Sequence, residues 1–148
     1  MKTIDIAIHT GVLYAPSAVY HTLTDYEHAG EWFPEIQRFR SDTGGTHHRL
    51  TFRWRPFIIS GLITQEVPDE HILMQLDTEP LTGSCEWQLQ PGDMGTALTI
   101  ILRAKIQSIV HQGLLLIRNY EYLIRNDCRQ YFRALTQELE RRTLTSDR

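Results

Sequence analysis

The chain has 148 residues, a length that suits one domain with an apolar core of its own. Its formal net charge is −3, from 15 Lys and Arg against 18 Asp and Glu, which gives no reason to expect nucleic-acid binding. No apolar run approaches the roughly 20 residues of a membrane span, and the N-terminal residues lack the apolar stretch of a secretory signal. We therefore expect one soluble domain over residues 1–148, located in the cytoplasm.

The first predicted elements are a strand and two short helices. Ile4, Ile6 and Ile8 alternate with more polar neighbours, so residues 3–13 are predicted to form a β-strand. Pro16 suits the first position of a helix, where the N–H that proline lacks would be unpaired in any case. A second short helix is expected to end before Pro34, because proline disfavours helical backbone at the residue before it.

The middle of the chain repeats every two residues, as antiparallel strands do. Leu50, Phe52 and Trp54 alternate with polar residues in the first such segment. We therefore predict a run of antiparallel strands with one face turned toward the core. Further strands are predicted at residues 58–67, which are apolar on both sides, at 72–76, at 85–90, where the alternation returns, and at 96–104. Turns containing Gly, Pro and Asp separate several of them.

The last long segment, residues 112–142, is predicted to be one amphipathic helix. At about 100° per residue its apolar positions fall on one stripe, while arginine, asparagine and glutamine fall on the opposite side. Such a helix needs an apolar surface to pack on, and the predicted sheet is what can supply it. We therefore expect an α+β domain in which a sheet holds a long helix. The stripe consists of Ile117, Tyr120, Ile124, Cys128, Tyr131, Leu135 and Leu139.

Short motifs lie around the predicted elements, namely Val12-Leu13-Tyr14-Ala15-Pro16, Val19-Tyr20, Asp25, Trp32-Phe33-Pro34-Glu35-Ile36, Val67-Pro68-Asp69 and Gly95-Thr96-Ala97-Leu98-Thr99. In this order the chain resembles the polyketide cyclase/dehydrase family. That family belongs to the helix-grip (SRPBCC) superfamily, together with START-type lipid-transfer domains, pollen allergens of the birch type and coenzyme Q-binding proteins. The resemblance implies a helix-grip fold, in which a curved antiparallel sheet wraps around the long C-terminal helix, two short helices follow the first strand, and a deep cavity lies between sheet and helix. It implies no single activity, since one fold hosts many functions.

The resemblance turns several side chains from core residues into candidate ligand contacts. Periodicity alone favours core packing for the aromatic residues, but in a helix-grip fold the inward sheet face and the first turns of the long helix line the cavity. An apolar and aromatic lining with a few polar groups suits a hydrophobic small molecule. The expected ligand contacts are Trp32, Phe52, Trp54, Leu62, Thr64, Glu66, Trp87 and Tyr120, with Trp54 and Trp87 as the first choice.

Glu66 departs from the pattern of the aromatase/cyclases that the chain resembles. In those enzymes an arginine often stands before the Val-Pro-Asp turn and points into the cavity. The two-residue repeat from Ser60 predicts that positions 62, 64 and 66 face inward together. A carboxylate there has the wrong sign to stabilise an enolate. A tyrosine of those enzymes is also replaced, by Ile36. Both differences weaken the case for cyclase chemistry, although a protonated Glu66 could donate a hydrogen bond or a proton.

Two carboxylates beside the helix stripe, Glu121 and Asp127, are further candidates for catalysis. Burial would raise the pKa of either carboxylate, as a general acid or base at neutral pH requires. The alternative for both is a hydrated carboxylate at the rim of the cavity, or one paired with an arginine.

No metal and no cofactor are expected. The seven histidines show no metal-ligand spacing, and the chain has no Gly-rich phosphate loop or nucleophile elbow. Cys85 and Cys128 have no paired spacing, so both are predicted to be buried thiols.

Arginines form a basic stripe on the outer face of the predicted long helix. A solvated surface is the ordinary interpretation, and docking to an acidic partner or an anionic membrane is the alternative. The stripe consists of Arg118, Arg125, Arg129 and Arg133.

Three functions are compatible with these features. The leading hypothesis is binding of a hydrophobic small molecule, such as a lipid, a quinone or a polyketide-like ring system, in the cavity. The second is a cyclase, aromatase or dehydratase that acts on a carrier-bound chain, which would need polar groups at the reacting atom. The third is an interaction domain whose interior is filled.

Overall fold

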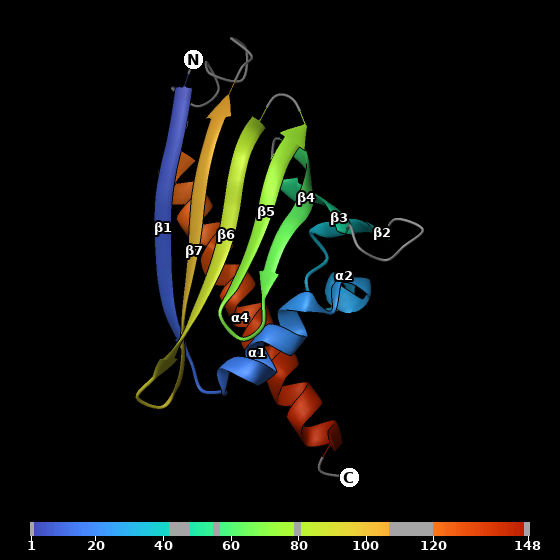
Figure 1. Cartoon of the computed structure of the whole chain (residues 1–148), viewed down its shortest axis with the longest axis vertical. Coiled ribbons are helices and arrows are strands. Elements are labelled where there is room, and N and C mark those ends of the chain that lie inside the picture. The colour runs from blue at the N-terminus through green and yellow to red at the C-terminus, as the bar shows by residue number, and fades with distance from the viewer. Residues whose placement is uncertain (1, 42–47, 55–56, 79–80, 107–119, 147–148) are drawn as a thin grey trace.

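The computed structural model describes residues 2–41, 48–54, 57–78, 81–106 and 120–146. The described strands form one antiparallel sheet in the order β1-β7-β6-β5-β4-β3-β2. Figure 1 shows that the sheet is curved and that the long helix α4 (Tyr120–Ser146) crosses behind it. The strands are β1 (Lys2–Val12), β2 (Ile36–Ser41), β3 (His48–Trp54), β4 (Phe57–Val67), β5 (His71–Thr78), β6 (Leu81–Gly92) and β7 (Gly95–Ile106).

The short helices lie between β1 and β2, as predicted. They are α1 (Pro16–Thr24), the 3-10 helix η1 (Tyr26–His28) and α2 (Ala29–Trp32). Pro16 opens α1, and the Val19 N–H donates to the Ala15 carbonyl oxygen at 3.1 Å. The first turn therefore forms without a side-chain cap.

The apolar stripe of the long helix is confirmed for its described members, with Cys128 and Tyr131 part-buried against the core and three other members fully buried. Ile124, Leu135 and Leu139 are 2% exposed or less. The predicted helix began at residue 112, but residues 112–119 lie outside the described part. The structure extends the helix beyond the predicted end at residue 142 to Ser146.

The core lies between the concave face of the sheet and α4. On β1 and β7, directly opposed residues share a face, and the pairs Ile4 with Ala104 and Ile6 with Leu102 are buried. Each fully buried aliphatic side chain contributes roughly 1.5–3 kcal/mol of transfer free energy. The predicted alternation of β1 is therefore confirmed. The curved antiparallel sheet, the short helices after β1 and the long helix α4 together confirm the predicted helix-grip architecture.

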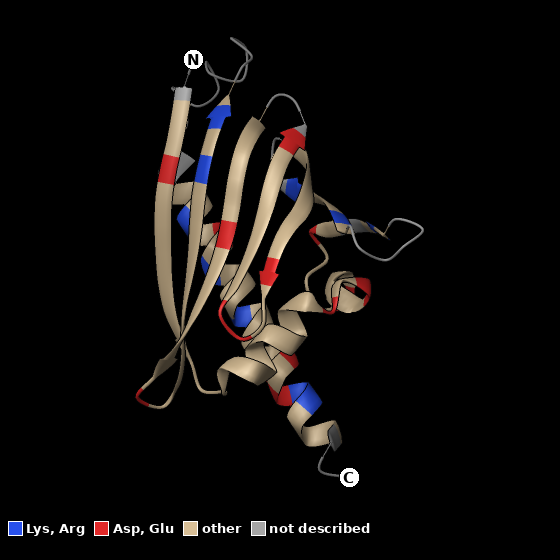
Figure 2. Ribbon diagram, viewed as in Figure 1, with Lys and Arg blue, Asp and Glu red and all other residues tan. Residues whose placement is uncertain are grey.

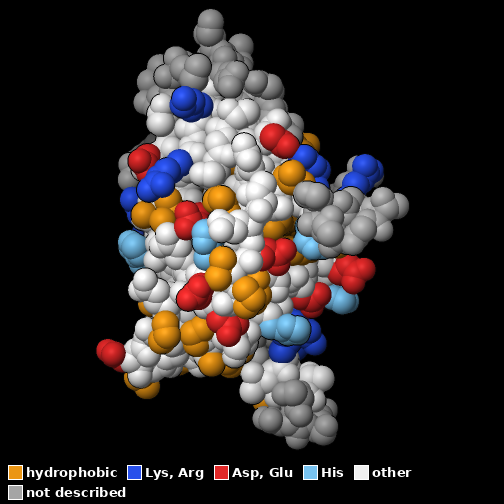
Figure 3. Space-filling view, in the orientation of Figure 1, with side chains coloured by type: hydrophobic (Ala, Val, Ile, Leu, Met, Phe, Trp, Pro, Cys, Tyr) orange, Lys and Arg blue, Asp and Glu red, His pale blue; other side chains and the backbone are white. Residues whose placement is uncertain are grey.

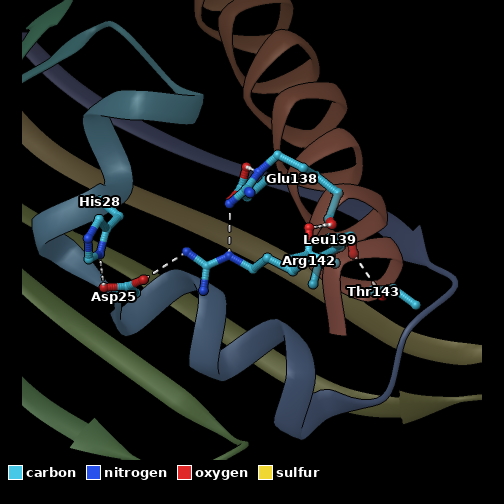
Figure 4. A network of polar contacts seen from close by, with 8 residues as sticks. Asp25, His28, Glu138, Leu139, Arg142 and Thr143 are labelled. Atoms are coloured by element: carbon cyan, nitrogen blue, oxygen red, sulfur yellow. Dashed lines mark hydrogen bonds and ion pairs between the residues drawn. The ribbon is translucent and has the colours of Figure 1, made fainter. Parts of the chain in front are cut away.

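An ion-pair network ties the C-terminal part of α4 to the end of α1 (Figure 4). Arg142 bridges Glu138, at 3.0 Å, and Asp25, at 2.8 Å. Asp25 in turn lies 2.8 Å from His28 in η1. The network therefore connects the helix to the η1–α2 segment, which covers one side of the interior.

Candidate functional site

A cavity of about 340 Å³ lies between the sheet, the η1–α2 segment and α4. Its lining is mainly apolar and aromatic, and its volume is at the small end of the range of roughly 300–1,000 Å³ found for ligand pockets. From the helices it is lined by Leu23, Tyr26, Ala29, Trp32, Phe33, Ile124, Asp127, Cys128, Gln130 and Tyr131. From the strands it is lined mainly by Ile6, Ile8, Leu50, Phe52, Ile63, Ile72, Met74, Leu76, Cys85, Trp87, Ile100 and Leu102.

Tyr131 is the centre of an aromatic cluster on the helix side of the cavity. Its ring lies 5.4 Å from that of Trp32 and 5.0 Å, edge to face, from that of Phe33. Burial raises the pKa of the Tyr131 hydroxyl, and the nearby Trp87 indole partly offsets this shift. The hydroxyl therefore stays protonated at neutral pH.

Indole N–H groups supply hydrogen-bond donors in this apolar lining. The indole nitrogens of Trp32 and Trp87 are buried, and neither forms a hydrogen bond of ordinary geometry within the described residues. An indole N–H can donate but cannot accept. The Trp32 group therefore suits an acceptor atom brought in by a ligand, while the Trp87 group also lies near the Tyr131 hydroxyl.

The cysteine thiols also lie on the cavity wall. Burial raises the pKa of Cys85 well above its ordinary range and that of Cys128 to about 12. Because the thiolate is the nucleophile and the metal ligand, both side chains are inert thiols at neutral pH. In the described part of the chain, no group of three or more His, Cys, Asp or Glu residues could hold a metal ion.

The rim of the cavity carries an ion pair. Arg53 donates to both carboxylate oxygens of Glu35, at 3.0 and 3.3 Å, and both residues line the cavity. Both side chains are more than a third exposed, so the pair adds little to stability. It does place opposite charges side by side at the opening.

The structure brings together some of the predicted site residues. Trp32, Phe52, Trp87 and Asp127 line the cavity. Whether they bind a ligand stays a prediction. The side chains of Trp54, Tyr120 and Glu121 lie outside the described part.

The prediction of which β4 residues face inward is wrong for the first half of the strand. Ile59, Gly61 and Ile63 are the buried positions, whereas Ser60 accepts a hydrogen bond from Arg49 on the other face at 2.9 Å. The prediction that Leu62 and Thr64 contact a ligand takes every second residue from Ser60 as inward-facing. Because Ser60 itself lies on the solvent face, neither Leu62 nor Thr64 belongs to the described cavity lining.

A bulge at Thr64 then reverses the alternation. β4 pairs with β5 up to Ile63 and again from Gln65, so Thr64 is left as an extra residue. Beyond it Glu66 pairs with Ile72, which is buried in the cavity wall, and directly opposed residues share a face. Glu66 therefore lies on the inner side, but through the bulge and not through the predicted repeat. Its side chain is exposed and is not among the described lining residues.

The arginines of the basic stripe differ in their surroundings. Figure 2 shows basic positions that recur along α4. Arg129 and Arg133 are exposed, whereas Arg125 is partly buried and donates to the Ala7 carbonyl oxygen of β1 at 3.4 Å. Arg118 lies outside the described residues.

The face of the molecule seen in Figure 3 carries acidic, basic and apolar side chains interspersed with one another. No described helix is long and apolar enough to cross a membrane.

Tyr26 and Tyr131 are cavity residues that the sequence reasoning did not select. Tyr131 falls on the predicted helix stripe, so a search of that stripe for polar tips would have found it. Tyr26 lies in the single 3-10 turn of η1, where no periodicity reveals an inward face.

Comparisons with known proteins agree with this geometry. A family model described as "Polyketide cyclase / dehydrase and lipid transport" matches residues 12–119, while a comparison with curated proteins finds no significant match. Among solved structures, the chain is similar to the Zhui aromatase/cyclase from Streptomyces sp. R1128, with a TM-score of 0.73, 18% identity and 96% of each chain covered.

Two further solved structures are similar over nearly their whole length. A START superfamily protein from Mycobacterium smegmatis has a TM-score of 0.69 and 15% identity, with 94% of this chain and 97% of that chain covered. A protein from Thermus thermophilus has a TM-score of 0.69 and 16% identity, with 93% of this chain and 97% of that chain covered. At such identities these likenesses show the fold. The family model spans well over half of the sequence, and the chain belongs to the polyketide cyclase/dehydrase and lipid transport family.

Proposed function

We propose that the protein binds a hydrophobic small molecule in the cavity between the sheet and α4. The observation that carries the proposal is the cavity itself, about 340 Å³ with a mainly apolar and aromatic lining. Membership in a family described by both cyclase/dehydrase chemistry and lipid transport supports it. A lipid, a quinone or a polyketide-like ring system fits this chemistry.

An enzyme of the cyclase, aromatase or dehydratase type is the second candidate. The similarity to an aromatase/cyclase structure and the presence of Asp127 in the lining favour it. Against it, the pKa values of Tyr131, Cys85 and Cys128 are raised, mainly by burial, which keeps these groups protonated and makes them poor bases or nucleophiles. The position of the family arginine holds Glu66, a group of the opposite charge.

The binding function is tested by titration with Nile red, a neutral apolar dye, against wild type, Trp87→Ala and Leu62→Ala. Trp87 lines the cavity, whereas Leu62 lies on the other face of the sheet and serves as the matched control. We expect Trp87→Ala to weaken dye binding by about tenfold or more, with a stability loss below the roughly 3–5 kcal/mol of a tryptophan truncated in a packed core. Unchanged dye affinity per folded molecule, together with a core-sized stability loss, would contradict the proposal.

We also make three proposals about domain organisation, cellular location and a partner surface. Residues 1–148 are proposed to form one domain, and the protein is proposed to act in the cytoplasm. The exposed Arg129 and Arg133 are proposed to approach an anionic surface. Sedimentation with anionic lipid vesicles tests the last point, since reversal of both charges to Glu should abolish binding, and retained binding would exclude this surface.

A further inference from the structure

Tyr26 places a buried hydroxyl at the cavity wall, close to the Glu66 carboxylate. The residue is 6% exposed and lines the cavity, and its hydroxyl forms no hydrogen bond of ordinary geometry within the described residues. Buried polar groups in native proteins are as a rule paired, and an unpaired one costs roughly 1–3 kcal/mol. The hydroxyl is thus positioned to donate to an acceptor that enters the cavity.

Aromatic packing holds the Tyr26 ring in place. Its centroid lies 5.7 Å from that of Phe39, in a stacked arrangement, and 5.2 Å from that of His48. Both partners come from neighbouring strands at the β2–β3 side of the sheet. The ring therefore has little freedom to turn its hydroxyl elsewhere.

Glu66 determines the charge around this hydroxyl. The bulge at Thr64 brings Glu66 to the inner side of the sheet. Burial, and next the negative charge of Glu66, raise the pKa of Tyr26 far above its ordinary range. The Glu66 side chain itself is exposed. Tyr26 is therefore a neutral hydrogen-bond donor and cannot act as a base near neutral pH.

The charges along the described lining disfavour an anionic ligand. Arg53 is the one cation among the described lining residues, and Glu35 neutralises it through two hydrogen bonds. Glu66 lies opposite the lining residue Ile72 and adds a carboxylate beside this end of the cavity. A ligand carboxylate near Tyr26 would bring a second full negative charge beside Glu66, whereas a neutral carbonyl could accept the Tyr26 hydrogen without adding a charge.

We propose that Tyr26 selects neutral ligands that carry an acceptor oxygen, by donating its hydroxyl hydrogen to a ligand carbonyl, and that Glu66 excludes anionic ligands from this end of the cavity. This inference rests on the proposed binding function and narrows it from hydrophobic molecules in general to neutral carbonyl compounds. The indole N–H groups of Trp32 and Trp87 supply further donors for such compounds.

The test compares probes of one ring size that differ only in their polar group. Fluorene has no acceptor, 9-fluorenone has a neutral carbonyl, and fluorene-9-carboxylate is an anion. Their affinities are measured by displacement of Nile red from wild type, Tyr26→Phe, Glu66→Gln and the control Tyr20→Phe. Tyr20 also lies near Glu66 but is not among the described lining residues, and each Phe variant keeps its ring and so its packing.

We expect wild type to prefer fluorenone over fluorene by about threefold to tenfold, the range of one net hydrogen bond. Tyr26→Phe should lose this preference with fluorene affinity unchanged, and Tyr20→Phe should keep it. Glu66→Gln should bind the carboxylate more tightly than wild type does, with fluorenone affinity unchanged.

A full ketone preference in Tyr26→Phe, or a wild type that binds the carboxylate best, would overturn the inference while leaving cavity binding intact. Failure of Nile red itself to bind wild type would instead overturn the proposed function, and the inference with it. The two failures are therefore distinguishable.

Discussion

Arg142 is the residue whose truncation should most clearly loosen α4 from the η1–α2 segment. Its side chain is 24% exposed and joins Glu138, on its own helix, to Asp25 at the end of α1. Glu138 is buried, with 7% of its surface exposed. In Arg142→Ala, Glu138 keeps its hydrogen bonds to Arg141. Asp25 keeps its hydrogen bond to His28 (Figure 4). The variant thus removes the link between the two helices and leaves both carboxylates with a second partner.

The expected loss of unfolding free energy in Arg142→Ala depends on how far the ion pairs of Arg142 are shielded from water. A hydrogen bond between charged groups contributes about 1.5–3 kcal/mol when it is shielded from water, and much less when it is exposed. Arg142 makes two such contacts in a half-buried position, and both carboxylates keep a second partner, so we expect a loss of about 2 kcal/mol. Arg141 contacts the same Glu138 but is 61% exposed, and Arg141→Ala should cost less than about 1 kcal/mol.

The assay is urea unfolding of both variants, followed by far-ultraviolet circular dichroism at pH 7. The free energy of unfolding should fall clearly further for Arg142→Ala than for Arg141→Ala. Equal losses would show that burial does not set the strength of this bridge. A larger loss for Arg141→Ala would show that the contact within α4, and not the link to α1, stabilises the fold.

Two further predictions concern pH and backbone strain. The hydrogen bond to Asp25 raises the pKa of His28 above 6.5, so the stabilising contribution of the His28–Asp25 pair is complete below pH 6.5 and is lost as pH rises through the raised pKa. The urea concentration at the unfolding midpoint should therefore fall between pH 6 and 8.5, and His28→Gln should make this fall smaller. A fall of the same size in His28→Gln would assign the pH dependence to other groups. Gly83 has φ 148°, and an added Cβ would lie 2.1 Å from the Arg103 carbonyl oxygen, so Gly83→Ala should lower the free energy of unfolding by more than about 1 kcal/mol. At Gly11 an added Cβ meets nothing within 4 Å, so Gly11→Ala should change the free energy of unfolding by no more than about 0.5 kcal/mol. Similar losses in both variants would refute the strain at Gly83.

Regular patterns allowed most of the fold to be predicted from sequence. The alternation of Ile4, Ile6 and Ile8 marks β1, and the stripe through Ile124 and Leu135 marks α4, because each element buries one continuous face. Pro16 marks the start of α1 through the conformation that proline imposes. These signals are local, so they survive without knowledge of the tertiary structure.

The site was predicted less completely because its geometry depends on irregular backbone. The bulge at Thr64 places Leu62 and Glu66 on opposite faces of the sheet, although both are even-numbered positions of one strand. No residue type in that segment signals the bulge. Tyr26 reaches the cavity from a 3-10 turn, and its contacts with Phe39 and His48 join segments that are distant along the chain. Only the assembled sheet brings these residues together.

The central claim is that the space between sheet and helix is a binding cavity and not a filled core. Cys128 faces this space from the N-terminal third of α4, so the larger side chain of Cys128→Leu should occupy part of the space. We predict that Nile red affinity falls at least about threefold, while the free energy of unfolding stays unchanged or rises. In a filled core the added bulk would cost roughly 1–3 kcal/mol. A loss of that size with dye affinity unchanged would contradict the claim.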